Sequence, residues 1–376
     1  MKDRIYLDNN ATTGVDARVM EAMLPELSSI PNNPSSVHFF GQEAKNRLQS
    51  CRETIASYLK VKPHEILFTS GGTEAMNMLI KGFFPKEVSG HVITSNVEHS
   101  CVHNTLKSLH EKGLDVSFLP AGLLGAVTAD QVKSAIKSNT RFIVLNAVNN
   151  ETGIKHDLAA IGKVALDANI PLIVDGVSWM GKEPIVIPPG VVAMGFSAHK
   201  FHGPKGVGFV FVRSSLKLAP LLTGGDQEYK MRAGTENFPG IVGMAKAVDL
   251  LSTELPEAAH RMALLRDKLE AGLLQKANPV VVNGMGPRIC NTCNLAFPNT
   301  QGEDLLIALD MAGIAASHGS ACSSGALEPS RVLTSMGLPA QIAKSAIRFS
   351  LSRNTTEEEI DRAIDIVSAI VKRLRS

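Results

Sequence analysis

Residues 195–206 read Gly195-Phe-Ser-Ala-His-Lys-Phe-His-Gly-Pro-Lys-Gly206, and this segment determines how the rest of the 376-residue chain is interpreted. The hydrophobic run Val191 to Phe196 predicts a buried strand that enters a polar turn with Ser197, His199 and Lys200. A lysine at the end of a buried strand can have a lowered pKa, and its amine is then a usable nucleophile. A lone turn lysine is more often simply exposed, so the interpretation of Lys200 depends on residues upstream.

Two upstream segments supply the missing context. Pro171-Leu-Ile-Val-Asp175 is an apolar strand that ends in a carboxylate, and Glu65-Ile-Leu-Phe-Thr-Ser-Gly-Gly-Thr-Glu74 is a strand that runs into a glycine-rich helix start. A Schiff-base lysine, an aspartate for a pyridine nitrogen and a helix N-terminus for a phosphate are the groups that pyridoxal phosphate requires. The chain has no Walker-type pattern, and its other glycine cluster does not open a helix, so neither an ATP nor a dinucleotide site is predicted.

Strands alternate with helices from Glu65 to Val212, which predicts an α/β fold with a mostly parallel sheet and helices on both faces. Seven strands are expected, at Ile66–Thr69, His91–Ser95, Asp115–Leu119, Arg141–Val148, Leu172–Asp175, Val192–Phe196 and Val207–Val212. In such sheets ligands bind at the carboxyl ends of the strands. The polar clusters occur there, at Thr69–Thr73, Glu98–His99, Asn149–Glu151, Asp175 and Ser197–Lys200.

The length of the chain predicts two domains. A long helix from Pro239 past Leu273, interrupted near Pro256, is expected to join them. We expect a large cofactor-binding domain over residues 12–256 and a smaller α+β domain over residues 1–11 and 257–376. The smaller domain is expected to contain helices at Gly302–Ala312, Pro329–Met336 and Thr356–Arg375 and strands at Val280–Val282, Asn294–Phe297, Ala315–Ala316 and Ala346–Ser350.

The composition excludes several classes of protein. The 38 basic and 36 acidic residues are balanced and form no block of like charge, so neither nucleic acid nor a membrane is expected as a partner. No segment has the roughly eighteen uninterrupted apolar residues of a membrane helix, and the N-terminus lacks a signal-peptide pattern. Five cysteines, an odd number spread over a long chain, indicate reduced thiols in a cytoplasmic protein.

The cysteines differ in their surroundings. Cys322 lies in Ala315-Ala-Ser-His-Gly-Ser-Ala-Cys-Ser-Ser-Gly-Ala326, a segment of small residues with little to anchor a core. A thiol in an exposed polar loop suits a reactive nucleophile, although an incidental thiol fits the pattern equally well. Cys51 lies on a helical apolar stripe and is expected in the core. Cys290-Asn-Thr-Cys293 has the spacing of a redox or metal pair, but it has no second pair, so no metal site is expected.

Three further residues are candidates for the site. Arg348 is a charge inside the otherwise apolar strand Ala346–Ser350, and a buried arginine requires an anion from the protein or from a ligand. Asn33, in an Asn-Pro-Ser-Ser loop, could share a ligand carboxylate with it. His99 follows a strand end; such a histidine is often structural, but beside a pyridine ring it could stack and move protons.

These motifs together resemble the cysteine desulfurases of the NifS/IscS type, which are fold-type I pyridoxal-phosphate enzymes of the class V aminotransferase group. The resemblance covers nearly the whole chain, from Tyr6-Leu-Asp8 to Thr355-Thr-Glu-Glu-Glu-Ile360. The matching motifs include Ala11-Thr-Thr13, Thr69-Ser-Gly-Gly-Thr-Glu74, Val148-Asn-Asn-Glu151, Ser197-Ala-His-Lys200, His202-Gly-Pro-Lys-Gly206, Arg232-Ala-Gly-Thr235, Gly319-Ser-Ala-Cys322, Leu327-Glu-Pro-Ser330 and Ile347-Arg-Phe-Ser350.

The resemblance implies a role for each cofactor-binding residue. Lys200 would hold the cofactor covalently and act as the proton-transfer base, Asp175 would pair with the pyridinium nitrogen, and His99 would stack on the ring. Asn150 would contact the phenolic oxygen of the ring. The phosphate would be bound by Gly72, Thr73, Ser197 and His199, with Thr235 reaching in from the second subunit of a homodimer.

The resemblance also implies the substrate and the reaction. Arg348 and Asn33 would hold the carboxylate of L-cysteine, and Cys322 would take the sulfur as a persulfide while L-alanine is released. The sulfur would then pass to a scaffold or carrier protein for iron–sulfur cluster or thiocofactor assembly. A mobile loop suits Cys322, because the same sulfur has to reach both the cofactor and the partner.

The chain departs from the family pattern at two positions. Ser178 stands where the family usually has a glutamine that contacts the phenolic oxygen, and the shorter side chain puts this contact in doubt. Ala198 stands where glycine is common, which we expect to be harmless.

Two other functions are compatible with these motifs. A selenocysteine lyase or an aminotransferase could use the same fold, and an aminotransferase would not need Cys322. A catalytically idle scaffold protein is the third hypothesis, but Lys200 and Asp175 are not needed for folding alone and argue against it.

Overall fold

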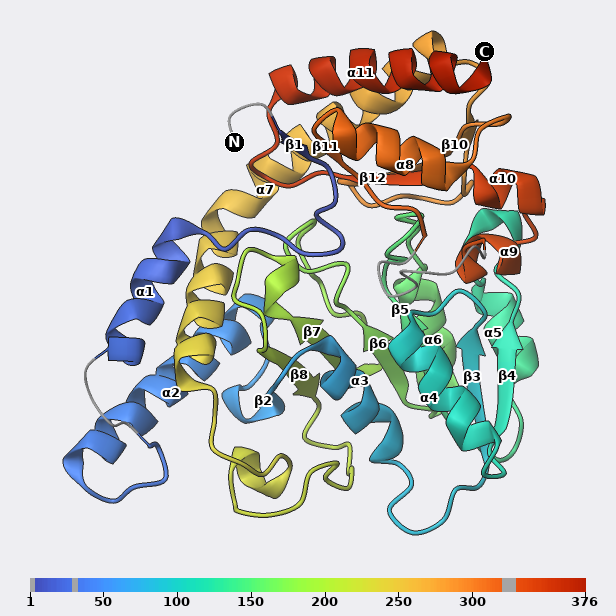
Figure 1. The fold of residues 1–376 in the computed structure, drawn as a ribbon. Helices are drawn as coiled ribbons and strands as arrows, with labels where there is room; N and C mark the ends of the chain where they lie inside the picture. The colour runs from blue at the N-terminus through green and yellow to red at the C-terminus, as the bar shows by residue number, and fades with distance from the viewer. Residues whose placement is uncertain (1–3, 29–32, 320–328) are drawn as a thin grey trace.

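The computed structural model describes residues 4–28, 33–319 and 329–376, and a seven-stranded sheet lies at its centre (Figure 1). In spatial order the strands are β2 (Ile66–Thr69), β8 (Gly208–Val212), β7 (Val191–Ser197), β6 (Leu172–Asp175), β5 (Thr140–Asn146), β3 (His91–Ser95) and β4 (Asp115–Leu119). Strand β8 is antiparallel to both of its neighbours, and the other neighbouring strands are parallel. The predicted mostly parallel seven-stranded sheet is confirmed.

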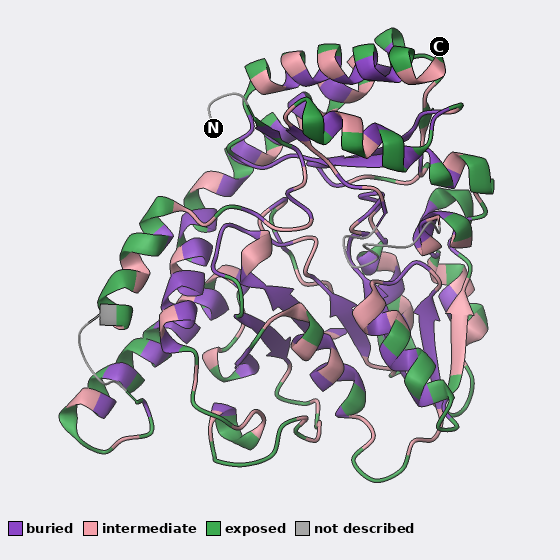
Figure 2. Ribbon diagram, viewed as in Figure 1, coloured by how far each residue is buried: buried purple, intermediate pink, exposed green. Residues whose placement is uncertain are grey.

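Helices cover both faces of this sheet, and its central strands are therefore buried on both sides (Figure 2). Successive residues of a strand point to opposite faces, so Phe142 and Ile143 belong to two different hydrophobic clusters. One face packs against α3 (Gly72–Lys81) and α4 (Ser100–His110). The other face packs against α2 (Phe39–Leu59), α5 (Ala129–Ala135), α6 (Leu158–Asp167) and the first part of α7 (Phe238–Lys276).

A smaller α+β unit has its own hydrophobic cluster, as expected. Its antiparallel sheet consists of β12 (Ala346–Ser350), β10 (Thr292–Ala296) and β9 (Val281–Val282). Near the N-terminus, β1 (Ile5–Tyr6) pairs with β11 (Ile314–Ala315), which brings the start of the chain into this unit. The remaining helices are α1 (Ala17–Ser28), α8 (Gly302–Met311), α9 (Arg331–Ser335), α10 (Ala340–Lys344) and α11 (Glu357–Arg375).

Helix α7 connects the two units without the interruption that the sequence predicted at Pro256. The prediction was wrong because the flanking residues Leu255 and Ala258 are buried and hold the helix against the core. The helix packs in the large cluster as far as Met262 and in the small one from Leu265 onward. The expected domain boundary at residue 256 stays a prediction. None of the helices in the described ranges is both long and apolar enough to cross a membrane.

Most element bounds differ from the predicted ones by one to three residues, as expected at frayed ends. The larger difference is α5, which ends at Ala135 although the pattern predicted a helix to about Asn139. Thr128 caps this helix as predicted, with its hydroxyl accepting from the backbone N–H of Gln131.

A buried ion pair anchors the loop that follows β8 to the edge of the sheet. The Arg52 guanidinium donates to both carboxylate oxygens of Glu228, at 2.8 and 2.7 Å, and Glu228 also accepts from the backbone N–H of Phe68 in β2 at 2.7 Å. The Arg52 and Glu228 side chains are only 5% and 1% exposed. Each charge is therefore tolerated in the interior only because the other is present.

We expect Arg52→Met to lower the free energy of unfolding by about 3–5 kcal/mol, because it leaves the Glu228 carboxylate buried without its partner. The double variant Arg52→Met with Glu228→Gln should recover part of this loss. Urea unfolding of the three proteins measures both effects. A single variant within about 1 kcal/mol of the wild type would show that the pair is not required.

Candidate active site

A cavity of about 220 Å³ opens at the carboxyl ends of the central strands. Strand register brings its walls together, because Asn146 at the end of β5 lies opposite Asp175 at the end of β6. The smaller unit closes the opposite side with Arg348 from β12. The lining residues are Asn10, Ala11, Gly72, Thr73, His99, Cys101, Asn146, Val148, Asn150, Asp175, Val177, Ser178, Ser197, His199, Lys200 and Arg348.

Lys200 reaches this cavity from the turn that follows β7. The strand ends at Ser197, and a single 3₁₀ turn, Ala198–Lys200, redirects the chain. The Lys200 amine donates hydrogen bonds to the carbonyl oxygens of Asn10 and Ala11, the latter at 3.0 Å. The N-terminal segment therefore orients the amine that the sequence analysis singled out.

The buried Asp175 carboxyl and the partly buried His99 imidazole lie within 4.8 Å of each other. One Asp175 oxygen accepts from the backbone N–H of Val177 at 3.0 Å, and burial raises the pKa of this carboxyl while His99 and Lys200 lower it. Burial lowers the pKa of His99. Because His99 Nδ1 accepts from the backbone N–H of Cys101 at 3.2 Å, the neutral ring carries its proton on Nε2. The imidazole is thus held in one tautomer beside the carboxylate.

The first turn of α3 forms the second end of the cavity. Gly71 caps this helix with φ of +149°, a conformation that favours glycine, and the free backbone N–H groups of the first turn attract an anion. A Cβ atom at Gly72 would lie 2.7 Å from the Val177 side chain, so only glycine fits there. Burial and the neighbouring lysines lower the pKa of His199 to about 4, so this ring is neutral at pH 7.

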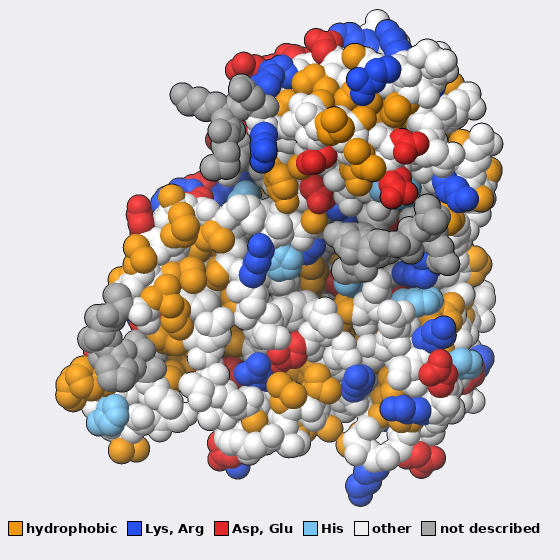
Figure 3. Space-filling view, viewed as in Figure 1, with side chains coloured by type: hydrophobic (Ala, Val, Ile, Leu, Met, Phe, Trp, Pro, Cys, Tyr) orange, Lys and Arg blue, Asp and Glu red, His pale blue; other side chains and the backbone are white. Residues whose placement is uncertain are grey.

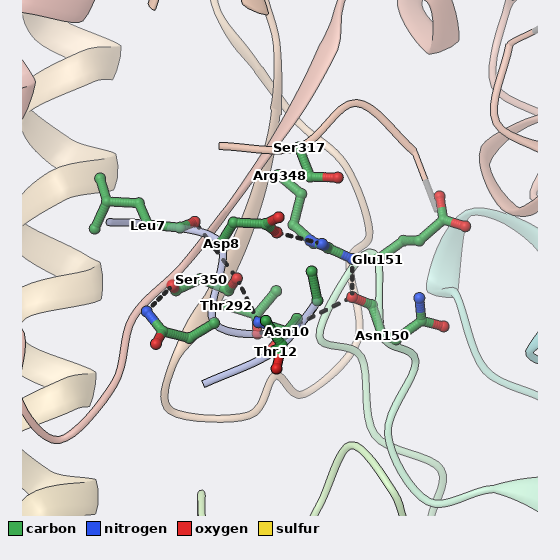
Figure 4. Close-up of polar contacts among 12 residues, drawn as sticks. Leu7, Asp8, Asn10, Thr12, Asn150, Glu151, Thr292, Ser317, Arg348 and Ser350 are labelled. Carbon is green, nitrogen blue, oxygen red and sulfur yellow. Dashed lines mark hydrogen bonds and ion pairs between the residues drawn. The ribbon is translucent and has the colours of Figure 1, made fainter. Parts of the chain in front are cut away.

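Arg348 is engaged by the protein itself (Figure 4). Its guanidinium forms a 2.6 Å ion pair with Asp8 and donates to the carbonyl oxygen of Asn150 at 3.0 Å. The side chain is 1% exposed, and its Nε is buried without a partner among the described residues. Arg348 therefore presents a positive charge to the cavity with hydrogen-bonding capacity left for a ligand.

A second carboxyl group lies directly behind the site. Glu98 is completely buried, accepts a hydrogen bond from the Ser95 hydroxyl at 2.5 Å, and has its other oxygen unpaired among the described residues. Burial, together with the negative charge of Asp175, raises the pKa of Glu98 to about 8. Glu98 is therefore protonated at pH 7, and Asp175 is the carboxylate that faces the cavity.

The structure gathers most of the predicted site residues in this one cavity. It brings together Lys200, His99, Asp175, Gly72, Thr73, Asn150, Ser178, Ser197, His199 and Arg348. Thr235 is exposed and lines a separate hollow with Arg232, and Asn33 is exposed with its side chain accepting from the backbone N–H of Ser35. Within the single chain neither residue reaches the cavity. Cys322 lies outside the described residues.

Six lining residues were not predicted as site residues, namely Asn10, Ala11, Cys101, Asn146, Val148 and Val177. Asn10 and Ala11 belong to a segment to which no role was assigned, although it is unusually polar for a segment that follows a strand. Cys101 lies two residues after His99, and its Sγ is 3.0 Å from His99 Nδ1. Its place in the first turn of a helix that begins at the site was the signal that could have identified it.

Comparison with known proteins gives consistent matches. The family model described as aminotransferase class-V matches residues 5–363. A cysteine desulfurase from Nostoc sp. is 42% identical over 375 residues, covering 99% of this chain and 94% of the relative. The cysteine desulfurase IscS of Methanosarcina thermophila is 40% identical, covering 99% of this chain and 93% of the relative.

Solved structures share the whole fold. A structure described as a NifS-like protein superimposes with a TM-score of 0.90 at 36% sequence identity, covering 98% of this chain and all of the other. A structure described as SspA in complex with cysteine has a TM-score of 0.81 at 33% identity, covering 94% of this chain and all of the other.

We expect the stabilising effect of Glu98 to depend on pH. Its carboxyl group keeps a proton in the folded protein up to about pH 8, whereas the unfolded chain releases it near pH 4.5. Glu98 therefore favours folding most below pH 4.5, and its contribution falls between pH 4.5 and 8 by about 1.4 kcal/mol per pH unit at most.

Glu98→Gln removes this proton while keeping the shape of the side chain. The difference in unfolding free energy between wild type and variant should therefore shift in favour of the variant from pH 5 to pH 8. Urea titrations at both pH values measure it, and the exposed Glu257→Gln is the control. A difference that does not change with pH would contradict the assignment of a neutral Glu98.

Proposed function

The chain belongs to the class-V aminotransferase family and, within it, to the cysteine desulfurases, and from this premise we propose its reaction in detail. L-cysteine and the Cys322 thiol are converted to L-alanine and a Cys322 persulfide, so the sulfur leaves one carbon and joins one thiol without any other reactant. The observation that carries this proposal is the meeting of Lys200, Asp175, His99 and Arg348 in one cavity.

The residues present fit pyridoxal phosphate, the cofactor of this family. Asp175 offers a buried carboxylate to a pyridinium nitrogen, and the first turn of α3 offers N–H groups to a phosphate. Lys200 lines the same cavity as Asp175 and the first turn of α3. Asn146 Oδ1 is buried and unpaired among the described residues, which leaves an acceptor in the wall for a bound group. When bound, the cofactor supplies the electron sink that weakens the bonds next to the amine of the amino acid.

Each side chain of the cavity has a separate role in the proposed reaction. Asp175 holds a negative charge at one end, where it stabilises positive charge on the ring. Neutral His99 donates from Nε2 and covers one side of the cavity. Lys200, once freed from the carbonyl groups of Asn10 and Ala11, is placed to take and return a proton. Arg348 orients the carboxylate of L-cysteine by charge-assisted hydrogen bonds.

The described cysteines support the assignment of the sulfur acceptor to Cys322. Cys51, Cys290 and Cys293 are buried, and burial raises their pKa values to about 11, 12 and 12. Burial, together with the negative charge of Asp175, also raises the pKa of Cys101. The thiolate is the reactive form, so these four thiols are poor nucleophiles at neutral pH.

Two features support a homodimer as the working form. Thr235 is exposed in a hollow of its own, where it is available to a second subunit. Helix α1 exposes Met20, Leu24 and Leu27 by 50%, 59% and 65%, and Figure 3 shows hydrophobic side chains gathered on this face over α1. Contiguous apolar surface of this kind marks a protein–protein contact. We further propose that a scaffold or carrier protein of the cytoplasm collects the sulfur.

We expect purified wild-type protein, loaded with pyridoxal phosphate, to release alanine from L-cysteine in the presence of a reductant. Cys322→Ala should lose this release, because no other thiol can accept the sulfur. The matched control Cys51→Ala removes a buried thiol and should retain it. Release by Cys322→Ala would exclude Cys322 as the acceptor, and a loaded wild type that releases nothing would contradict the reaction.

We expect Arg348→Lys to raise KM for L-cysteine by roughly 10- to 100-fold, which corresponds to the loss of about 1.5–3 kcal/mol of charged hydrogen bonding. The control is Arg353→Lys, because Arg353 is similarly buried but pairs with Asp16 and Glu254 outside the cavity. Steady-state kinetics of both variants distinguish the two arginines. An unchanged KM in Arg348→Lys would remove Arg348 from substrate binding.

A further inference from the structure

Lys182 is a buried lysine that the proposed reaction does not use. It lies seven residues after Asp175, in the segment Asp175-Gly-Val-Ser-Trp-Met-Gly-Lys182, and is only 3% exposed. Its ammonium group donates a hydrogen bond to the carbonyl oxygen of Lys200. The preceding Gly181 has φ of +78°, and a Cβ atom there would lie 2.4 Å from the Phe201 side chain. The loop that carries Lys182 is therefore packed closely against the turn that carries Lys200.

The surroundings of Lys182 are unusual for a buried lysine. Buried lysines normally pair with a carboxylate, but the groups that shift the pKa of this one include Cys290, Lys200 and Arg353 and no carboxylate. The adjacent Glu183 is directed elsewhere, to the Lys155 ammonium and to the backbone N–H of Cys290. Burial, together with the positive charges of Lys200 and Arg353, lowers the pKa of Lys182 to about 8, so the group is mostly charged at pH 7.

A buried charge without a carboxylate destabilises the fold, so its presence in this position needs a reason. Its hydrogen bond fixes the peptide group of Lys200, and the direction of a side chain follows from the position of its own backbone. Its charge acts on the same residue, since two like charges at short range each favour the neutral form of the other. Both effects act on Lys200, the residue that needs a defined position and a neutral amine.

We propose that Lys182 is a positioning residue for Lys200: it holds the turn that directs the Lys200 amine into the cavity and places a second positive charge beside that amine. This inference rests on the proposed function of Lys200. It assigns to the loop after β6 a role in addition to carrying Asp175.

Several other groups face the two lysines and act on them together. Lys200 is acted on by Asp175 and His99, and it lies beside His199. Lys182 is also close to His202. His199 and His202 both have pKa values lowered to about 4 by burial and by the neighbouring positive charges, so they are neutral above pH 6. Lys205 also acts on His199. Between pH 6 and 8 Lys182 is therefore a buried positive charge next to Lys200 that can be removed by mutation.

The test compares enzymes loaded with pyridoxal phosphate in the absence of substrate. Visible absorbance, recorded against pH, reports protonation at the Lys200 nitrogen. In Lys182→Met we expect the midpoint to rise by about one pH unit, because a neighbouring positive charge is lost. Lys182→Arg keeps the charge and should stay close to the wild type. Lys155→Met removes the lysine that pairs with Glu183 and should leave the midpoint unchanged.

The outcomes separate this inference from the proposed function. An unchanged midpoint in Lys182→Met would overturn it, even if alanine is released normally. A shifted midpoint of equal size in Lys182→Arg would overturn the role of the charge, because arginine keeps it. If Lys182→Met does not fold, Lys182→Gln provides the same comparison, since it also removes the charge. Failure of wild type to release alanine would contradict the reaction, while the absorbance titration would still report on Lys182.

Discussion

The parallel register of β5, β6 and β7 is the constraint on which the rest of the site depends. Asn146 lies opposite Asp175, and Asp175 lies opposite Gly195, two residues before the strand gives way to the turn with Lys200. Three segments that are far apart in the sequence therefore deliver their polar ends to one edge of the sheet. The hydrophobic burial of the strands on both faces fixes this register, because a slip of one residue would turn each apolar side chain to the wrong face.

The smaller unit contributes a charged residue, Arg348, to the wall of the cavity. Asp8 comes from the start of the chain and Arg348 from its last strand, and the two side chains meet at 2.6 Å beside Asn150 of the large sheet. The pairing of β1 with β11 and the bridge of Asp8 to Ser350 bring these distant segments together. The positive group in the cavity wall is thus a consequence of how the two ends of the chain fold into one unit.

The sequence predicted the parts of the site that follow from local pattern. Each of three predicted parts of the site comes at the end of a buried strand, namely the α3 helix start, Asp175 and Lys200. This local pattern can be recognised without knowledge of distant contacts. The roles of Asn10 and Ala11 could not be predicted in this way, because their carbonyl groups accept from a lysine 190 and 189 residues away. Arg348 was predicted from its own charge, but its pairing with Asp8 depends on tertiary packing. The continuity of α7 through Pro256 likewise depends on the core around Leu255.

Incomplete pairing of buried titratable side chains distinguishes Glu98 and Lys182, which lie near the site, from the structural ion pair Arg52–Glu228. The Arg52 and Glu228 charges neutralise each other, and this ion pair has a structural role. Glu98 and Lys182 are equally enclosed, yet one Glu98 oxygen is unpaired among the described residues and no carboxylate is among the groups that shift the pKa of Lys182. Such groups cost stability, and both act on residues that line the cavity: Glu98 is near Asp175, and Lys182 donates to Lys200. Burial thereby keeps the Glu98 carboxyl neutral at pH 7, while the Lys182 hydrogen bond holds the peptide group of Lys200 in place.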